Sequence, residues 1–232
     1  MVEYARDDEL VEIRIDDGKV NAMSPAFFDE LNAALDRAEA ERPSALVLAG
    51  RAGYFSAGLN VKLLPTLAPD ELTRTLQSFG HTLLRVWSFP VPTVAAVTGH
   101  AVAGGLFLSF ACDLRVVARG AFRLHANEHA IGLPLPSWAL AITESAVPVS
   151  SFTEVMLHAR SFSPEEGLAH GFVTALAEPD GVVAAARALA APFAALNGGA
   201  YAASKQRIRS RALAWTAPLI PGEMVGFPAR GR

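Results

Sequence analysis

Residues 92–113 read PTVAAVTGHAVAGGLFLSFACD, and the predicted architecture of the chain starts from this stretch. The apolar and β-branched run Thr93–Val97 predicts a buried strand, residues 98–103 predict a turn with glycine, and an apolar helix is predicted from Gly104 and Gly105 onward. Because Gly104 has no Cβ, a ligand can approach its backbone, and the free N–H groups at a helix N-terminus carry partial positive charge. The stretch therefore predicts a site for an anion, or for an oxygen atom that becomes one.

Two other interpretations of this stretch fail. A phosphate-binding P-loop needs Lys and then Ser or Thr after the second glycine, whereas Gly105 and Leu106 follow Gly104. The apolar run from Val91 to Cys112 is long enough to suggest a membrane span, but a proline and three glycines divide it into a strand and a helix. We therefore expect neither a P-loop nor a membrane partner.

A second glycine-containing loop lies upstream, where residues 50–62 read GRAGYFSAGLNVK. Ala45–Ala49 predicts a short buried strand before it, and Ser56, Ala57 and Gly58 are small enough to leave backbone N–H groups accessible. Two strands that each end in such a loop could direct two N–H donors at one oxygen atom. This arrangement is the geometry of an oxyanion hole.

The combined sequence resembles the crotonase superfamily, also called the enoyl-CoA hydratase/isomerase family. The segments that carry the resemblance lie between Val20 and Val173 and are FSAGLN (55–60), AAVTGHAVAGG (95–105), LFLSFACD (106–113) and HANEHAIGL (125–133). The resemblance implies an α/β crotonase fold, in which strand–strand–helix units form a spiral. It also implies an acyl-CoA thioester substrate, whose carbonyl oxygen would be held by the backbone amides of Ala57 and Gly104.

The acidic residues indicate which branch of the family the chain resembles. Hydratases of this family use two glutamates; the first position falls on Phe107, which cannot transfer a proton, and the second falls on Glu128. The Asn127–Glu128 pair with an apolar residue at Phe107 is most similar to the Δ3,Δ2-enoyl-CoA isomerases, which use one glutamate. The resemblance therefore implies that Glu128 moves one proton while the double bond shifts from position 3 to position 2.

Elementary chemistry explains why one carboxylate can suffice. Isomerisation removes a proton at Cα and returns it at Cγ, and both carbons can face the same base. Hydration must also activate a water, which is easier with two carboxyl groups. Two alternatives remain open: a hydratase with an unrecognised second acid, such as Glu144 or a histidine of residues 125–129, and a non-catalytic acyl-CoA-binding protein.

His125, Glu128 and His129 also match the inverted zinc-peptidase pattern. That pattern requires both histidines on one face of a helix, together with a third ligand. A short strand is predicted at Phe122–Leu124, and glycine and proline follow at Gly132–Pro134, so a continuous helix is not expected. We expect no metal site and no redox cofactor; coenzyme A enters only as part of the substrate.

The resemblance implies a set of residues that contact the substrate: Ser56, Gly58, Asn60, Leu63, Leu64, Phe79, Phe107, Asn127, Trp138 and Lys205. Core packing is an equal or better explanation for Leu63, Leu64 and Phe79, and an even alternative for Trp138. Lys205 would lie near the coenzyme A phosphates, although a basic helix face is most often solvated surface.

Composition sets wider bounds on the function. A hydrophobic content of 51% suggests that apolar surface is buried between subunits, and the net charge of −3 argues against a nucleic-acid partner. Cys112 is the single cysteine, and the acidic N-terminus does not resemble a signal peptide, so a cytoplasmic location is expected. The resemblance implies a homotrimer or a dimer of trimers, with a core and acyl-CoA site in residues 1–174 and a C-terminal helical trimerisation region and tail in residues 175–232.

Other elements are predicted from periodicity and capping residues. They are a half-exposed strand at Leu10–Asp16, a helix capped by Ser24 that ends near Glu41, an amphipathic helix at Asp70–Trp87, a helix opened by a capping box at Ser163, terminal helices at Asp180–Leu196 and Tyr201–Trp215, and a loosely packed tail at Pro218–Arg232.

Overall fold

The stretch at residues 92–113 forms two strands and a helix in the computed structural model, which describes residues 1–223. Thr93–Val97 is β7, Gly99–Val102 is β8 and Gly104–Ala111 is α3. The predicted turn at residues 98–103 is therefore wrong, because most of it is strand β8. β8 pairs with another strand so closely that a Cβ on Gly99 would lie 2.0 Å from the carbonyl carbon of Gly53. Glycine thus serves close strand pairing there, not a turn.

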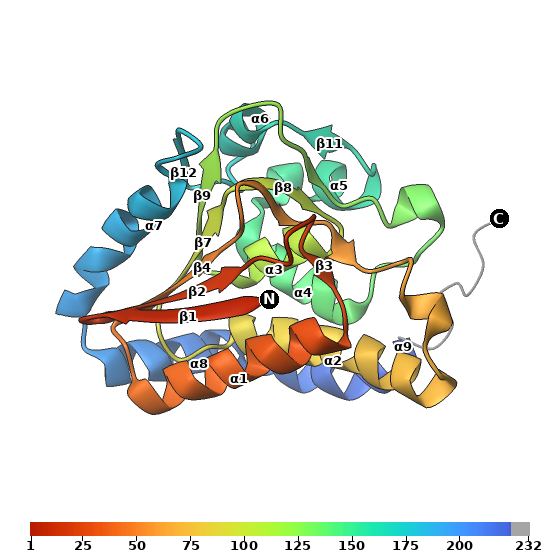
Figure 1. The fold of residues 1–232 in the computed structure, drawn as a ribbon, viewed down its shortest axis with the longest axis horizontal. Helices are drawn as coiled ribbons and strands as arrows, with labels where there is room; N and C mark the ends of the chain where they lie inside the picture. The colour runs from red at the N-terminus through yellow and green to blue at the C-terminus, as the bar shows by residue number, and fades with distance from the viewer. Residues whose placement is uncertain (224–232) are drawn as a thin grey trace.

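The same strand–strand–helix unit recurs before and after this stretch (Figure 1). The preceding unit contains β4 (Ala45–Ala49), β5 (Gly53–Ser56) and α2 (Pro69–Trp87). The following unit contains β9 (Leu114–Ala118), β10 (Leu124–His125) and α4 (Ser137–Ala146). In each unit the first strand enters one sheet, the second strand enters another, and the helix follows. The expected spiral of strand–strand–helix units is therefore present.

The strands form one large sheet and two smaller ones. The six-stranded sheet has the order β1-β2-β4-β7-β9-β12 and is parallel apart from the β1–β2 pair; the four-stranded sheet has the order β11-β10-β8-β5, and β3 pairs with β6. The remaining bounds are β1 Val2–Asp7, β2 Leu10–Ile15, β3 Ala22–Met23, β6 Gly58–Leu59, β11 Ser161–Phe162 and β12 Ala175–Ala177. β4 and β7 are buried at every residue, as expected for central parallel strands.

Helices cover both faces of the six-stranded sheet. One face packs against α7 (Val182–Ala190), whose buried residues contact the small side chains of β4, β7 and β9. The other face packs against the larger core that includes α1 (Pro25–Glu41) and the helices of the two later units (Figure 1). Ser24 caps α1 by accepting a hydrogen bond from Phe27 N–H, which confirms the predicted start of that helix.

The remaining helices follow the last spiral unit. They are α5 (Val149–Leu157), α6 (Pro164–Ala169), α8 (Gly198–Thr216) and α9 (Ile220–Glu223). The capping box predicted at Ser163 is present at the start of α6. Short 3₁₀ turns occur at Leu64–Thr66, His129–Ile131, Ala191–Ala195 and Ala217–Leu219.

The predicted loose tail is wrong for its first part. Ile220 is fully buried, and a Cβ on Gly80 of α2 would lie 3.1 Å from its Cδ1 atom. Ile220 therefore anchors residues 218–223 to the core, although the other residues of this segment are exposed. The rest of the predicted tail lies outside the described residues.

Within residues 1–223, no single helix has the length and hydropathy to cross a membrane. Two neighbouring helical segments, Val182–Ala195 and Gly198–Glu223, pass that test only together, and they meet at a bend of 107°.

Candidate active site

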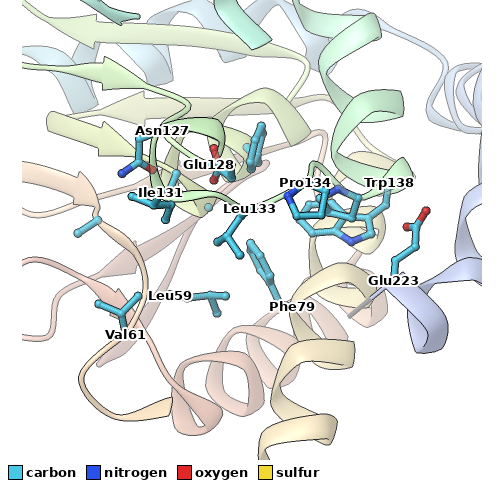
Figure 2. Close-up of a pocket in the computed structure, with 15 residues that line it drawn as sticks. Leu59, Val61, Phe79, Asn127, Glu128, Ile131, Leu133, Pro134, Trp138 and Glu223 are labelled. Atoms are coloured by element: carbon cyan, nitrogen blue, oxygen red, sulfur yellow. The ribbon is translucent and has the colours of Figure 1, made fainter. Parts of the chain in front are cut away.

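A cavity of about 320 Å³ lies where β6, the start of α3, the loop before α4 and α4 itself meet (Figure 2). Such a volume lies at the lower end of the usual range for small-molecule sites. Its lining residues are Ala57, Leu59, Val61, Phe79, Ala103, Gly104, Phe107, Asn127, Glu128, Ile131, Leu133, Pro134, Pro136, Trp138 and Glu223. The walls are therefore mainly apolar, with two carboxyl groups and one amide among them.

Two glycines bring the two predicted loops together beside this cavity. A Cβ on Gly58 would lie 2.9 Å from the backbone nitrogen of Gly104, and the φ angle of Gly58 is +80°. A Cβ on Gly104 would lie 2.7 Å from the ring of Phe79. A side chain at either position would separate the loops or displace the ring. The two loops therefore meet through bare backbone, as the sequence predicted.

The backbone of Gly104 is well placed to offer a hydrogen bond to a ligand. Gly104 is the first residue of α3, and the residue before it, Ala103, has a positive φ of 50° that is uncommon outside glycine. Ala103 is held there by its own N–H, which donates to the carbonyl oxygen of His125 at 2.7 Å. The first N–H groups of a helix have no acceptor within the helix. The Gly104 N–H thus lies at the cavity wall as a donor.

The backbone of Ala57 is engaged elsewhere, which corrects the expectation for this residue. Ala57 lines the cavity, but its N–H donates to the carbonyl oxygen of Val20 at 3.0 Å. An amide that already donates within the fold cannot also be the free donor of an oxyanion hole. The segment before β3 takes up this N–H because it runs beside the loop.

The hydrogen bonds of the neighbouring amides show which backbone N–H of this loop is still available to a ligand. The N–H of Gly58 donates to Ser56 Oγ at 3.1 Å, and the N–H of Asn60 donates to the carbonyl oxygen of Met23 at 2.9 Å. In the parallel β3–β6 pairing Met23 lies opposite Leu59 but accepts its hydrogen bond from the N–H of Asn60. Within residues 1–223 this pattern leaves the amide of Leu59, a residue that lines the cavity and whose neighbour Gly58 approaches Gly104. Leu59 is therefore the better candidate for the second donor. Its signal in the sequence was its position directly after the Gly58 that permits the close approach.

Glu128 is the most perturbed acidic group at the cavity. It precedes the 3₁₀ turn His129–Ile131, is 8% exposed, and its Oε2 atom has no hydrogen-bond partner among residues 1–223. Its backbone oxygen accepts from the N–H groups of Ile131 and Leu133, which holds the loop in place. Burial raises the pKa of the Glu128 carboxyl to about 7. A carboxyl group of this pKa can both accept and return a proton near neutral pH.

Three aromatic residues predicted to contact the substrate also line the cavity. The rings of Phe79 and Trp138 stack edge to face with centroids 4.8 Å apart, and those of Phe107 and Trp138 do so at 6.1 Å. Phe107 is almost completely buried and brings no acidic group to this wall. The aromatic cluster therefore forms an apolar, well-packed wall of the cavity.

Asn127 lines the cavity beside Glu128, as predicted (Figure 2). Its Oδ1 atom and the Nε1 atom of Trp138 are buried without a hydrogen-bond partner in the described part of the chain. Buried polar atoms of this kind are costly and usually find a ligand or water. The sequence did not point to the remaining lining residues, which are Leu59, Val61, Ala103, Ile131, Leu133, Pro134, Pro136 and Glu223. Glu223 comes from α9, and no pattern in the sequence pointed to it.

Five of the predicted contact residues do not line the cavity, and each is occupied within the fold. Ser56 is buried and donates through its Oγ to the carbonyl oxygen of Asn21 at 2.7 Å. Gly58 contributes only by letting its loop approach the backbone of Gly104 closely. The Oδ1 atom of Asn60 accepts from Leu63 N–H at 3.1 Å, so Asn60 shapes the loop. Leu64 packs in the core, as its alternative explanation proposed, whereas Leu63 is half-buried and belongs to neither the core nor the cavity lining.

Lys205 is the sixth predicted contact residue that does not line the cavity, and it is buried in an ion pair instead. Its Nζ atom lies 2.7 Å from Asp113 Oδ2 and donates to the carbonyl oxygen of Val91 at 3.0 Å. The side chain is only 5% exposed. This arrangement gives no support to a contact between Lys205 and the coenzyme A phosphates.

The histidines near Glu128 do not form the zinc-peptidase arrangement. His125 ends β10 and its ring contacts the carbonyl oxygen of Ala159 at 2.8 Å, whereas His129 lies in a 3₁₀ turn with its ring 3.0 Å from the carbonyl oxygen of Met156. The two residues are therefore not on one continuous helix. Residues 1–223 contain no group of three or more His, Cys, Asp or Glu side chains that could hold a metal ion.

Comparison with known proteins is consistent with this geometry. The family model described as enoyl-CoA hydratase/isomerase matches residues 5–214. The chain belongs to this family. The fold class expected from the resemblance, the crotonase fold, is thereby confirmed.

Some relatives of this chain are named enoyl-CoA hydratases and others enoyl-CoA isomerases. A putative enoyl-CoA hydratase of Thermus thermophilus is 36% identical over 194 residues, which are 82% of this chain and 76% of the relative. The structure of an enoyl-CoA isomerase from Mycobacterium tuberculosis is 37% identical, with a TM-score of 0.88 and 98% of both chains covered. The human mitochondrial Δ3-Δ2-enoyl-CoA isomerase has a TM-score of 0.90 over 96% of this chain and 88% of its own; at 22% identity it shows the fold alone.

Proposed function

We propose that this family member is an enoyl-CoA isomerase that shifts a double bond from position 3 to position 2 of an acyl-CoA. The observation that carries the proposal is the buried carboxyl of Glu128, whose Oε2 atom has no hydrogen-bond partner within residues 1–223. It lies at the same cavity as Gly104, whose backbone meets that of Gly58. Phe107 stands where a hydratase would place its other glutamate. The proposed reaction needs no metal and no redox cofactor.

The reaction begins with the thioester carbonyl oxygen held by backbone donors. In our proposal the N–H groups of Leu59 and Gly104 donate to this oxygen, so that negative charge can develop on it when the Cα proton leaves. Removing one donor of such a hole typically costs about 3 kcal/mol of transition-state stabilisation. Fixed backbone donors suit this role because they need no reorganisation during the reaction.

Glu128 then moves the proton. Its carboxylate takes the proton from Cα, the electrons delocalise over the dienolate, and the same carboxyl returns the proton to Cγ. The products are the conjugated enoyl-CoA and the carboxylate, so atoms and charge balance without a second acid. Apolar walls from Phe79, Phe107 and Trp138 favour this path because they disfavour a water beside the double bond.

A hydratase is the second candidate, and one observation favours it. Glu223 is another carboxyl group that lines the cavity, whereas Glu144 does not, although both residues are exposed. Its carboxylate is hydrogen-bonded to Ser137. That engagement makes Glu223 less available to activate a water, and it is the reason we rank hydration second.

Double-bond movement in D₂O tests the proposal. We expect the wild type to conjugate a trans-3-enoyl-CoA with little water addition, and Glu128→Gln to lose about 10²–10⁴-fold in kcat, as removal of an essential base does. Glu144→Gln, which neutralises an exposed carboxylate outside the cavity, is the control and should keep the wild-type rate.

The pH dependence of the same reaction gives a second readout. Because the base must be ionised, kcat/KM should rise as pH increases through about 7, the pKa of Glu128. Predominant water addition that is abolished by Glu223→Gln would instead establish the hydratase. Binding without either reaction would leave an acyl-CoA-binding protein.

We also propose that the chain assembles as a homotrimer or a dimer of trimers through its C-terminal helices. Support comes from two large apolar side chains of α8, Ile208 and Trp215, which are 80% and 54% exposed in the isolated chain. Apolar surface of this kind commonly marks a subunit interface. Light scattering should give a mass of three or six chains, and a monomer would refute this assembly.

A further inference from the structure

The cavity has two distinct ends, with Glu128 between them (Figure 2). Val61 and Ile131 lie at one end and are 61% and 52% exposed. Trp138, which is fully buried, and Glu223 lie at the other end. A substrate that reaches Glu128 therefore extends toward both ends.

Charge distinguishes which part of a thioester each end would hold. Lys62 is exposed and follows Val61 directly in the chain, so that end carries a nearby positive charge. The other end carries the carboxylate of Glu223, which would repel the phosphates of coenzyme A. The coenzyme part therefore belongs at the Val61 end, and the acyl chain runs toward Trp138 and Glu223.

A single contact fixes the segment that closes the acyl end. The Glu223 carboxylate accepts from the backbone N–H of Ser137 at 2.9 Å and from its Oγ–H. Ser137 is the first residue of α4, and the residue before it provides no side-chain cap. A carboxylate at this position stabilises unpaired helix N–H groups and is favoured by the helix dipole. Glu223 thus serves as the cap of α4.

The other end of α9 is anchored on a different helix. Ile220 is fully buried against α2, next to Gly80, and a Cβ on Gly80 would also lie 3.0 Å from Trp138 Nε1. The short helix α9 therefore joins α2 to α4 across the aromatic end of the cavity. The contact between Glu223 and Ser137 is what holds its second end down.

We propose that the Glu223–Ser137 contact closes the acyl end of the cavity and thereby limits the length of the acyl chain that the protein accepts. Glu223 is in this sense a specificity-determining residue that acts by positioning α9. The inference rests on the proposed function only in requiring an acyl-CoA in this cavity; it does not require Glu128 to be the base.

Binding of two saturated acyl-CoAs tests the inference without turnover. Isothermal calorimetry would compare butanoyl-CoA with dodecanoyl-CoA on wild type, Glu223→Ala and Glu223→Gln. Glu223→Ala removes the contact and should raise the affinity for dodecanoyl-CoA relative to butanoyl-CoA by about tenfold or more, since each methylene buried is worth about fourfold. Glu223→Gln keeps an acceptor oxygen for Ser137 and should shift the ratio much less.

A matched control and a second variant keep the result interpretable. Glu165→Ala removes another exposed first-turn carboxylate, on α6, and should leave the affinity ratio at its wild-type value. Ser137→Ala removes only the Oγ–H donor, so it should shift the ratio of the two affinities in the same direction as Glu223→Ala but to a smaller extent. This variant replaces Glu223→Ala as the test if Glu223→Ala does not fold.

The outcomes separate the inference from the proposed function. If butanoyl-CoA binds and the ratio is the same in wild type and Glu223→Ala, the inference is wrong while the acyl-CoA site stands. If neither thioester binds the wild type, both the site and the inference are wrong.

Discussion

Glu128 is held in a position where its ionised form is poorly solvated. Its side chain is buried among apolar residues, its Oε2 has no partner within residues 1–223, and burial raises its pKa to about 7 from the usual value of 4.5. The folded state therefore binds a proton more tightly than the unfolded chain does. This raised pKa costs stability at neutral and higher pH, in return for a base that is effective there.

The cost can be measured with the neutral variant Glu128→Gln. Between pH 4.5 and about 7 the folded wild type holds a proton that the unfolded chain has released, so its free energy of unfolding falls as pH rises through this window. Above pH 7 the full penalty, at most about 3 kcal/mol, is present. Glu128→Gln should therefore be more stable than wild type at pH 8, and the difference should shrink toward pH 5.

Urea unfolding at one fixed protein concentration measures this difference, because assembly would otherwise change the midpoint. The control is Glu144→Gln, whose exposed carboxylate should give no comparable gain at pH 8. A Glu128→Gln variant that is less stable than wild type at both pH values would show that the carboxylate is solvated or paired in the folded state.

At the scale of elements, α3 lies on β5 so closely that only glycine fits between them. A Cβ on Gly105 would lie 2.1 Å from the carbonyl oxygen of Ser56, and backbone cannot move aside as a flexible side chain can. Gly105→Ala should therefore displace the start of α3 and cost about 3 kcal/mol or more, despite the better helix propensity of alanine.

Gly199→Ala is the matched control, because Gly199 lies in the first turn of α8 and a Cβ there meets only Asn197 Oδ1, at 3.5 Å. That variant should be as stable as wild type or slightly more stable. Thermal unfolding of both variants checks the contrast. Equal stability of the two would mean that α3 does not rest on β5.

Elements with a local pattern were predictable from the sequence, whereas contacts set by the fold were not. α1 begins after its Ser24 cap and β7 covers Thr93–Val97, as predicted, because capping and hydrophobic runs are local signals. β8 was missed because its pairing with β5 is long-range and its glycine resembled turn chemistry. The assignment of Ala57 as a donor failed for a related reason: hydrogen bonds to the segment at residues 20–23 decide which amides of this loop are engaged.

The cavity lining shows the same limit. Phe79, Phe107, Asn127, Glu128 and Trp138 were found because the family resemblance covers their segments. Leu63 and Leu64 lie at the start of a short 3₁₀ turn whose path no local pattern determines, and Glu223 reaches the cavity from α9, far away in the sequence. Which side chains meet at a cavity depends on tertiary packing, and the sequence pattern alone does not contain that information.

At the scale of the whole molecule, a buried charge cluster attaches the long C-terminal helix α8 to the spiral. Asp113 pairs with Lys205 and Arg209 of α8, each at 2.7 Å, and accepts a hydrogen bond from Tyr201 at 3.0 Å. Burial opposes ionisation of Asp113, but Lys205 and Arg209 outweigh it and hold the pKa of Asp113 below its usual value. Residues 92 to 113 and the C-terminal helix are thus joined through ionic contacts as well as apolar packing.

The final prediction separates this structural role of Lys205 from the coenzyme A contact expected from the sequence. Lys205→Met keeps the length of the side chain but removes the ion pair with Asp113 and the hydrogen bond to Val91, so the free energy of unfolding should fall by about 2 kcal/mol. Arg209 still partners Asp113, which keeps the loss below that of a fully unpaired buried charge. KM for an enoyl-CoA, measured well below the unfolding temperature, should stay within about twofold of wild type, because a side chain away from the cavity makes no differential contact with the thioester.

Lys62→Met is the matched comparison, since Lys62 is exposed and follows Val61, which lies at one end of the cavity. The stability of this variant should change by less than about 0.5 kcal/mol while its KM rises. The opposite pattern, with a raised KM and unchanged stability in Lys205→Met, would mean that Lys205 leaves Asp113 to meet the coenzyme A phosphates.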